Sequence, residues 1–361
     1  MAYLPLVLAR IIVVLVVALP VQASAFGWAG MRLAANPMPF LGAITPGRAG
    51  ALWFTERHGI GRITQAGRVT AFPLPRPDQA PLDIAQGPDG NLWFTEAHAI
   101  GRMTLDGRVR LFPLADHDIQ PGFITTGPDG NLWFTANTAS NDRNVVVRIT
   151  VTGRVTEYGV PTRNSSVSGI TTGPDHNLWF TETNRNKIGR ITLRGRITEF
   201  PLPTIPVGQG YSNFPTTITT GPDGNVWFAQ FQRRIGRITP HGVVTEFPLF
   251  VATTAISPST APARSSGVPQ IITTGPDGNL WFTEVYGNNI GRITLTGRVT
   301  EFSLPTPNSG PTGIATGADG NLWVTETCSN SIARITPVGA VKEFRVSSST
   351  HWNGTYCIPP I

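Results

Sequence analysis

Residues 272–302 read I-T-T-G-P-D-G-N-L-W-F-T-E, followed by a short loop, I-G-R-I-T, a turn at Gly297, and R-V-T-E-F. Seven variants of this segment follow one another along the chain, and each carries one tryptophan: Trp53, Trp93, Trp133, Trp179, Trp227, Trp281 and Trp323. One copy holds four short β-rich runs separated by Gly, Asp and Pro, which is the content of one propeller blade. The repeat therefore predicts an all-β, seven-bladed β-propeller of four-stranded antiparallel blades.

Composition agrees with many short strands joined by tight turns. Of 361 residues only 14% are charged, while Gly (39) and Pro (32) are abundant and recur at fixed positions of the repeat. We read them as turn residues. The array runs without a linker, so residues 26–346 are predicted to form one propeller. Residues 1–25 are predicted to be a signal peptide and residues 347–361 a C-terminal tail.

The N-terminus has the pattern of an export signal. Arg10 precedes an apolar run, Ile11–Leu19, and an Ala-x-Ala cleavage site follows at Ala23–Ala25. The run is short for a membrane span, so no stable span is expected once the leader is removed. The sequence predicts a secreted or periplasmic protein, and an uncleaved N-terminal anchor is the alternative.

Two cysteines are present, Cys328 in the seventh repeat and Cys357 in the tail. In an oxidising compartment such a pair is expected to form a disulfide, which would tether the tail to the ring. A thiolate metal site is the alternative, but the two residues lack Cys-x-x-Cys spacing.

The formal net charge is +6. One arginine occupies the same strand position in every copy: Arg62, Arg102, Arg148, Arg190, Arg237, Arg292 and Arg334. We expect these arginines to pair across the sheet with glutamates of the next strand, such as Glu199 and Glu301. Export together with this internal pairing argues against a nucleic-acid partner, and the chain is expected to be a monomer.

Strand polarity predicts which end of the ring carries function. In an antiparallel blade, the start of the first strand, the end of the W-F-T-E strand and the crossover to the next copy share one end. The long insertions, within 138–144, 204–214 and 250–268, all fall there. We call this end the loop-bearing face and predict that it binds a small-molecule, peptide or protein ligand.

The phrases W-F-T-E, N-x-I-G-R-I-T and T-E-F-x-L-P-T-P closely resemble the virginiamycin B lyase, or streptogramin lyase, family over about Phe40 to Phe344. The resemblance implies a propeller that linearises a cyclic depsipeptide antibiotic by elimination across an ester bond. It also implies Mg²⁺ to polarise the substrate and a histidine to move the proton. Gluconolactonase-type propellers, which also bind a divalent cation, are a weaker comparison.

Carried over by position, the family's metal-binding glutamate corresponds to Glu326. The positions of its two functional histidines hold Gln270 and Thr312, and that of a further glutamate holds Gly310. Since Gln and Thr are not general bases near neutral pH, the resemblance predicts the scaffold more strongly than the reaction.

Other residues on the loop-bearing face suggest chemistry of their own. The W-F-T-E position is expected to present a partial ring of carboxylates, able to attract Mg²⁺ or Ca²⁺: Glu56, Glu96, Glu182, Glu284 and Glu326. Of these, Glu284 and Glu326 are the candidate metal ligands. The alternative is that each glutamate pairs with a neighbouring arginine or caps a loop.

Histidines suggest a second arrangement in one sector of the ring. His58 and His98 each follow a W-F-T-E glutamate by two residues, Asp83 lies at the start of the second copy, and His117 lies in the next crossover. The three histidines are the candidate catalytic residues of a relocated acid–base or metal site; solvated loop residues are the alternative.

Two functions follow from these observations. The first is an exported, streptogramin-lyase-like propeller that presents a ligand-binding face without lyase activity. The second is a metal-dependent carbon–oxygen lyase, or a hydrolase, acting on a cyclic ester or lactone.

Overall fold

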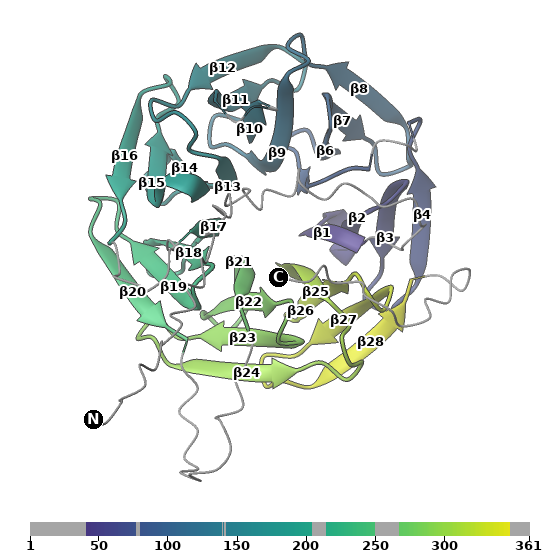
Figure 1. Cartoon of the computed structure of the whole chain (residues 1–361). Coiled ribbons are helices and arrows are strands. Elements are labelled where there is room, and N and C mark those ends of the chain that lie inside the picture. Colours follow the sequence, from purple (N-terminus) through teal and green to yellow (C-terminus); the bar gives the residue numbers. More distant parts are fainter. Residues whose placement is uncertain are drawn as a thin grey trace, which may run out of the picture.

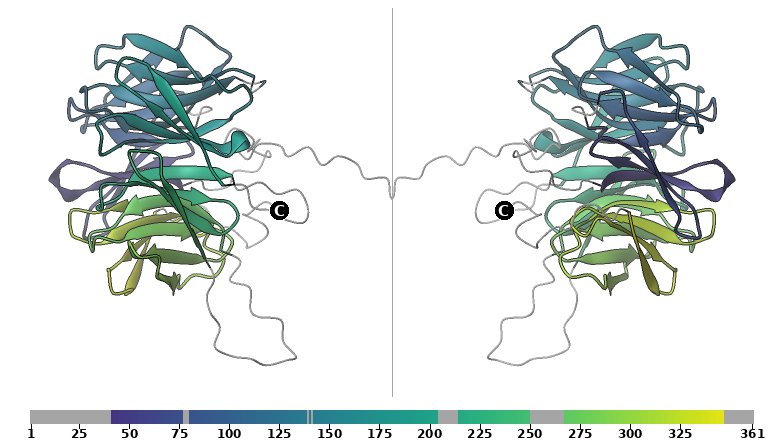
Figure 2. Two further views of the ribbon diagram at one scale, coloured as in Figure 1. Left: turned by 90° about the vertical axis from the view of Figure 1, so that its left-hand side faces the viewer. Right: turned by 90° about the vertical axis from the view of Figure 1, so that its right-hand side faces the viewer.

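The computed structural model describes residues 41–76, 80–138, 140, 142–203, 214–249 and 267–346. They form seven four-stranded antiparallel sheets arranged as the blades of a ring, which confirms the predicted propeller (Figure 1). Seen from the side, the ring is a disk (Figure 2). The described helices are two short 3-10 turns, η2 (Arg48–Gly50) and η3 (Thr183–Arg185). No helix in this part of the chain is long and apolar enough to cross a membrane.

Each blade is a run of four consecutive strands, from the first at the channel to the fourth at the rim. The first strands are β1 (Leu41–Pro46), β5 (Ile84–Gln86), β9 (Ile119–Thr126), β13 (Val167–Thr172), β17 (Pro215–Thr220), β21 (Pro269–Thr274) and β25 (Pro311–Thr316). The second strands are β2 (Leu52–Glu56), β6 (Leu92–Glu96), β10 (Leu132–Thr138), β14 (Leu178–Glu182), β18 (Val226–Gln230), β22 (Leu280–Glu284) and β26 (Leu322–Glu326).

The outer half of each blade repeats the same pattern. The third strands are β3 (Gly59–Ile63), β7 (Ala99–Met103), β11 (Asn144–Ile149), β15 (Lys187–Ile191), β19 (Arg234–Ile238), β23 (Asn289–Ile293) and β27 (Ser331–Ile335). The fourth strands are β4 (Val69–Pro73), β8 (Val109–Pro113), β12 (Val155–Gly159), β16 (Ile197–Pro201), β20 (Val244–Pro248), β24 (Val299–Ser303) and β28 (Val341–Arg345).

The hydrophobic core lies between neighbouring blades. Trp93 of blade 2, for example, packs with Leu132 and Phe134 of blade 3. Trp323 of blade 7 packs in the same way against Leu52 of blade 1, so the ring closes by packing and without an exchanged strand. All seven repeat tryptophans are at most 2% exposed.

The predicted pairing of the repeated arginines with fourth-strand glutamates is wrong. Arg190 lies opposite Thr198, and Glu199 lies opposite Gly189. Because successive side chains alternate between the faces of a sheet, the arginine and the glutamate emerge on opposite sides. Arg190 instead lies 3.5 Å from the carboxylate of Asp175 in the first turn of its own blade. Equivalent Arg–Asp contacts occur in blades 2 to 7.

These turn aspartates also hold the core tryptophans. In blade 6 the indole N–H of Trp281 donates to Asp277 Oδ1 at 2.9 Å, and blades 2 to 7 share this bond. Burial raises the pKa of Asp277, but hydrogen bonds from Trp281 and Asn279 outweigh it and hold that pKa below its ordinary value. Blade 1 has Ala49 at this position, and the buried Trp53 Nε1 has no hydrogen-bond partner among the described residues.

The strand register defines the loop-bearing face. Val167 pairs with Glu182, Glu182 with Lys187, and Lys187 with Pro201, so the start of the first strand and the ends of the second and fourth strands share one end of blade 4. The Gly-Pro-Asp turns lie at the other end, next to pairs such as Thr172 with Leu178. Parts of the two longest insertions, 204–213 and 250–266, lie outside the described residues.

Candidate functional site

The second-strand glutamates lie inside separate blades. Glu96, Glu182, Glu284 and Glu326 are at most 1% exposed. In the portion of the chain that the structure describes, no group of three or more His, Cys, Asp or Glu residues could hold a metal ion. The glutamates expected to form a carboxylate ring are therefore not brought together there as one cluster.

Space for the half-buried Glu56 comes from a glycine on the third strand. In blade 1 a Cβ atom added to Gly61 would lie 2.4 Å from Glu56 Oε1 and 2.2 Å from the ring of Phe54. Since Gly61 has no side chain, the glutamate and the phenylalanine can fold over the third strand toward the fourth.

In blades 4, 6 and 7 the buried glutamate meets a second carboxyl group. Burial, and then the neighbouring charge of Glu199, raises the pKa of Glu182 to about 8. Burial and Glu343 raise the pKa of Glu326 to about 8. Burial and Glu301 raise the pKa of Glu284 to about 7. Because the inner carboxyl is desolvated beside a like charge, it retains its proton to unusually high pH.

In blade 4 the outer member of the pair is held as an anion. Glu199 accepts hydrogen bonds from Lys187 Nζ at 2.8 Å and from Thr162 Oγ1 at 2.7 Å. Burial raises the pKa of Glu199, but the bonds from Lys187 and Thr162 outweigh it and keep that pKa below its ordinary value. Thr306 makes the same contacts with Glu343 in blade 7. The outer glutamate thus ties the incoming crossover to its blade.

Blade 5 carries a natural amide version of the acid pair. Gln230 stands where five other blades have glutamate, is fully buried, and donates from Nε2 to Glu246 Oε1 at 3.0 Å. An amide can replace a protonated carboxyl as the donor in this contact. The position therefore works as a neutral hydrogen-bond donor within the blade.

Glu326 is the residue on which to test the implied divalent metal. Mg²⁺ and Ca²⁺ take six or more oxygen ligands, commonly including water. The Glu326 side chain is fully buried, its Oε1 has no hydrogen-bond partner among the described residues, and its Oε2 lies 3.4 Å from the hydroxyl of Ser329. The described residues around it do not offer the ligand number that such an ion needs, so they do not fit a magnesium centre.

The two positions matched to the family's histidines take part in contacts between and within blades. The backbone carbonyl of Gln270 accepts from Thr217 Oγ1 at 2.5 Å, which joins blades 5 and 6. The Thr312 hydroxyl lies 2.5 Å from Thr327 Oγ1 and donates to the Gly310 carbonyl at 3.0 Å.

Asp83 lies at the centre of the ring. It lines a cavity of about 110 Å³ that is otherwise apolar or uncharged in the described structure, with walls from all seven blades. Its Oδ2 accepts from Ile124 N at 2.8 Å, and its N–H donates to Thr95 Oγ1 at 3.1 Å. Burial raises the pKa of Asp83 to about 7, although backbone N–H groups of Ile124 and Ile84 oppose the rise. Asp83 joins blades 2 and 3 across the channel wall.

Of the three candidate histidines, the structure brings two together. The rings of His98 and His117 have centroids 6.4 Å apart and meet edge to face at 69°. His58 occupies the same loop position as His98, one blade earlier: its carbonyl accepts from Leu74 N as that of His98 accepts from Leu114 N. Asp83 lines the central cavity, whereas His117 lines a shallow surface hollow.

Cys328 is disulfide-bonded. It is buried beside Gly310, whose φ of +67° places the backbone in the left-handed region. Cys357 lies outside the described residues, so the predicted pairing stays a prediction.

Sequence reasoning did not identify Glu199, Glu301 and Glu343 as partners of the second-strand glutamates. A signal was available in the strand alternation. Phe180 is paired with Gly189 on the third strand, and Gly189 is paired with Glu199 on the fourth. Glu182 lies two residues after Phe180, so its side chain is on the same side of the sheet. A glycine between two acids on one side of a sheet leaves room for them to meet.

The seven repeats form one closed β-propeller, and the same pair of acidic side chains recurs in blades 4, 6 and 7. The model of the virginiamycin B lyase family matches residues 33–249 and 208–353. The chain belongs to the virginiamycin B lyase family.

Three solved structures are similar. A streptogramin B lyase is 35% identical, with 82% of this chain and 93% of that chain covered and a TM-score of 0.69. Virginiamycin B lyase from Staphylococcus aureus is 38% identical, with coverages of 74% and 85% and a TM-score of 0.64. A catalytically inactive histidine-to-alanine variant of that enzyme with quinupristin is 37% identical, with coverages of 76% and 87% and a TM-score of 0.66. No curated protein sequence matches the chain.

Proposed function

We propose that this protein is an exported streptogramin-lyase-like propeller that binds a ligand on its loop-bearing face and does not open it by metal-assisted elimination. The observation on which this proposal rests is the burial of Glu326 beside a second carboxyl group. The carboxyl that corresponds to the family's metal ligand is fully buried and is paired with Glu343. A buried, protonated acid is a poor ligand for a hard cation, because metal binding requires the carboxylate.

The positions matched to the family's histidines support the same conclusion. Gln270 and Thr312 have no titratable group near neutral pH, so neither can accept the proton that an elimination releases. In the similar Staphylococcus aureus enzyme, a histidine-to-alanine variant is catalytically inactive and was crystallised with quinupristin. Cyclic depsipeptides of this type are therefore the first ligands to test here.

The export signal at 11–25 and the disulfide-bonded Cys328 support a secreted or periplasmic location, since disulfides persist in oxidising compartments. The predicted leader lies outside the described residues. The second candidate function is a metal-dependent carbon–oxygen lyase or hydrolase that uses His58, His98 or His117. Membership of the family favours it.

The test is to incubate the purified protein with virginiamycin B or quinupristin and Mg²⁺, with the Staphylococcus aureus lyase as the positive control. Chromatography with mass detection separates the outcomes: elimination gives a new peak of unchanged mass, whereas hydrolysis adds one water. We expect no product. We also expect the ligand to raise the melting temperature, because it binds only the folded state.

Two results would count against the proposal. Ring opening that disappears in Glu326→Gln would establish the lyase function instead. A melting temperature that neither antibiotic changes, together with no product, would show that streptogramins are not ligands of this propeller.

A further inference from the structure

His98 and His117 come from two separate segments that are tied together. His98 lies in the loop between β6 and β7, and His117 lies in the crossover between β8 and β9. The backbone N–H of Leu114, at the start of this crossover, donates to the His98 carbonyl at 3.1 Å. The two imidazoles therefore meet on segments whose spacing is set by a main-chain bond.

We propose that His98 and His117 form a binding site for a first-row transition-metal ion such as Zn²⁺ or Ni²⁺. A metal ion lies about 2.0–2.1 Å from each ligating nitrogen, so two imidazoles that share one tetrahedral ion have centroids roughly 5 Å apart. The observed centroid separation is 6.4 Å. The two rings therefore have to approach each other by about 1 Å for one ion to reach both.

The bonding state of His98 also points to a ligand. Its Nδ1 is buried and has no hydrogen-bond partner within the described structure. Buried polar atoms are nearly always partnered, and an unpartnered one suggests a group that the protein binds. When a metal binds one nitrogen of an imidazole, the other commonly carries the proton, so the metal also fixes the tautomer.

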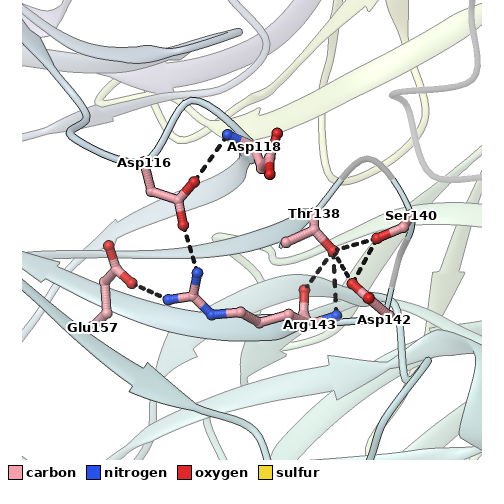
Figure 3. A network of polar contacts seen from close by, with 7 residues as sticks. All are labelled: Asp116, Asp118, Thr138, Ser140, Asp142, Arg143 and Glu157. Carbon is pink, nitrogen blue, oxygen red and sulfur yellow. Dashed lines mark hydrogen bonds and ion pairs between the residues drawn. The ribbon is translucent and has the colours of Figure 1, made fainter.

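His117 is held in place by the residues around it. Asp116 accepts a hydrogen bond from the Asp118 backbone N–H at 3.0 Å (Figure 3). This bond closes a tight turn, and His117 is the residue between its two partners. Arg143 then bonds to Asp116 through one guanidinium nitrogen and to Glu157 through the other, each at 2.5 Å. A metal-ligating side chain on a loop that is held by such contacts loses little conformational freedom when it binds an ion.

The charge of this surface favours a cation. The shallow hollow that His117 lines also contains the carboxyl groups of Asp116, Asp118 and Glu157. Arg143 is the cation paired with Asp116 and Glu157. Within this hollow the three carboxylates outnumber the one guanidinium that is paired with them.

The ligand set selects the kind of metal. Imidazole nitrogen suits Zn²⁺, Ni²⁺ and Cu²⁺, whereas Mg²⁺ and Ca²⁺ prefer oxygen. Two histidines supply two of the ion's positions, and the rest stay open to water or to an incoming ligand. This site is separate from Glu326 and does not depend on whether the protein opens a streptogramin.

The experiment uses the full-length mature protein without an affinity tag. Zn²⁺, Ni²⁺ and Mg²⁺ are titrated separately at pH 7.5 by calorimetry and by melting temperature. We expect one Zn²⁺ or Ni²⁺ per chain and no comparable binding of Mg²⁺. His117→Asn and His98→Asn should each weaken Zn²⁺ binding at least tenfold, because each removes one of the two imidazole ligands.

His241→Asn is the matched control, because His241 is an exposed histidine in a turn at the opposite end of the ring. It should leave the titration unchanged. His117 is exposed, so its substitution tests the site without disturbing the core. Zn²⁺ and Ni²⁺ binding that is absent in the unaltered protein, or that persists in His117→Asn, would overturn the proposal.

Discussion

At the scale of single residues, a position that looks catalytic in the sequence is structural in the fold. The W-F-T-E glutamates were expected to face a metal, but four of the five are buried within their own blades and Glu56 is half-buried. Their carboxyls pair with the fourth strand in blades 4, 6 and 7, and Gln230 makes the equivalent contact with an amide. Burial and the neighbouring carboxylate favour an uncharged side chain at this position in blades 4 to 7.

The raised pKa values predict how stability depends on pH. Below pH 4.5 the Glu182 carboxyl is protonated in both the folded and the unfolded protein. Between about 4.5 and about 8 the unfolded chain releases this proton while the folded blade keeps it, so the free energy of unfolding falls as pH rises. Glu182→Gln removes this loss. We expect it to stabilise the protein by roughly 1–3 kcal/mol at pH 8 and to change little at pH 4.5.

The reverse change, Gln230→Glu, is the control that the chain itself offers. It should destabilise the protein at pH 8 and have a smaller effect at pH 4.5, because it places a second carboxyl beside Glu246. Urea unfolding at the two pH values measures both variants. A Glu182→Gln variant less stable than the parent at pH 8 would show that the ionised carboxyl stabilises the blade.

At the scale of the strand, the third strand carries glycine opposite the second-strand phenylalanine in blades 1, 2, 4, 5 and 6, whereas blade 3 has Val147 opposite Phe134. A Cβ on Gly291 would lie 2.1 Å from the ring of Phe282. In blade 7 the equivalent residue is Ala333, and its partner is the smaller Val324. In blade 7 a larger residue on the third strand thus accompanies a smaller residue on the second strand, as expected in a close-packed core.

This packing predicts the cost of one methyl group. Gly291→Ala should destabilise the protein by about 1–3 kcal/mol, because the ring of Phe282 has to move. Gly159→Ala, at the end of β12, is the control, since nothing lies within 4 Å of its added Cβ. Thermal unfolding compares the two. Equal losses of stability in the two variants would mean that Phe282 can move away from the added methyl group without strain.

At the scale of the whole molecule, the ring has one joint that the chain does not cross. Blades 1 and 7 meet through β1 and β25, and the Thr325 hydroxyl donates to the Gly42 carbonyl at 2.6 Å. The equivalent bond between blades 2 and 3, from Thr95 to Gly122, joins segments that are also continuous in sequence. Closure therefore depends more on side-chain contacts at the joint between blades 1 and 7 than at the joints that the chain itself crosses.

Thr325→Val should open this joint. The change removes the donor to Gly42 and leaves buried backbone groups without partners, at a cost of about 1–3 kcal/mol. We expect faster amide exchange in β1, β25 and β26, whereas Thr95→Val should lower stability without selective exchange at the joint. Hydrogen exchange that stays uniform in Thr325→Val would show that tryptophan packing alone holds the ring closed.

The sequence by itself determined the number of blades, the strand content of each blade and the end at which loop length varies. These properties are periodic and local: seven tryptophans count the blades, and turn residues mark the strands. Only the tertiary structure decided where each polar side chain points. Alternation along three paired strands directs Arg190 to Asp175 and brings Glu182 to Glu199, and burial then sets their charge. Such contacts join residues in different strands or different blades, so neither their distances nor their protonation can be read along one copy of the repeat.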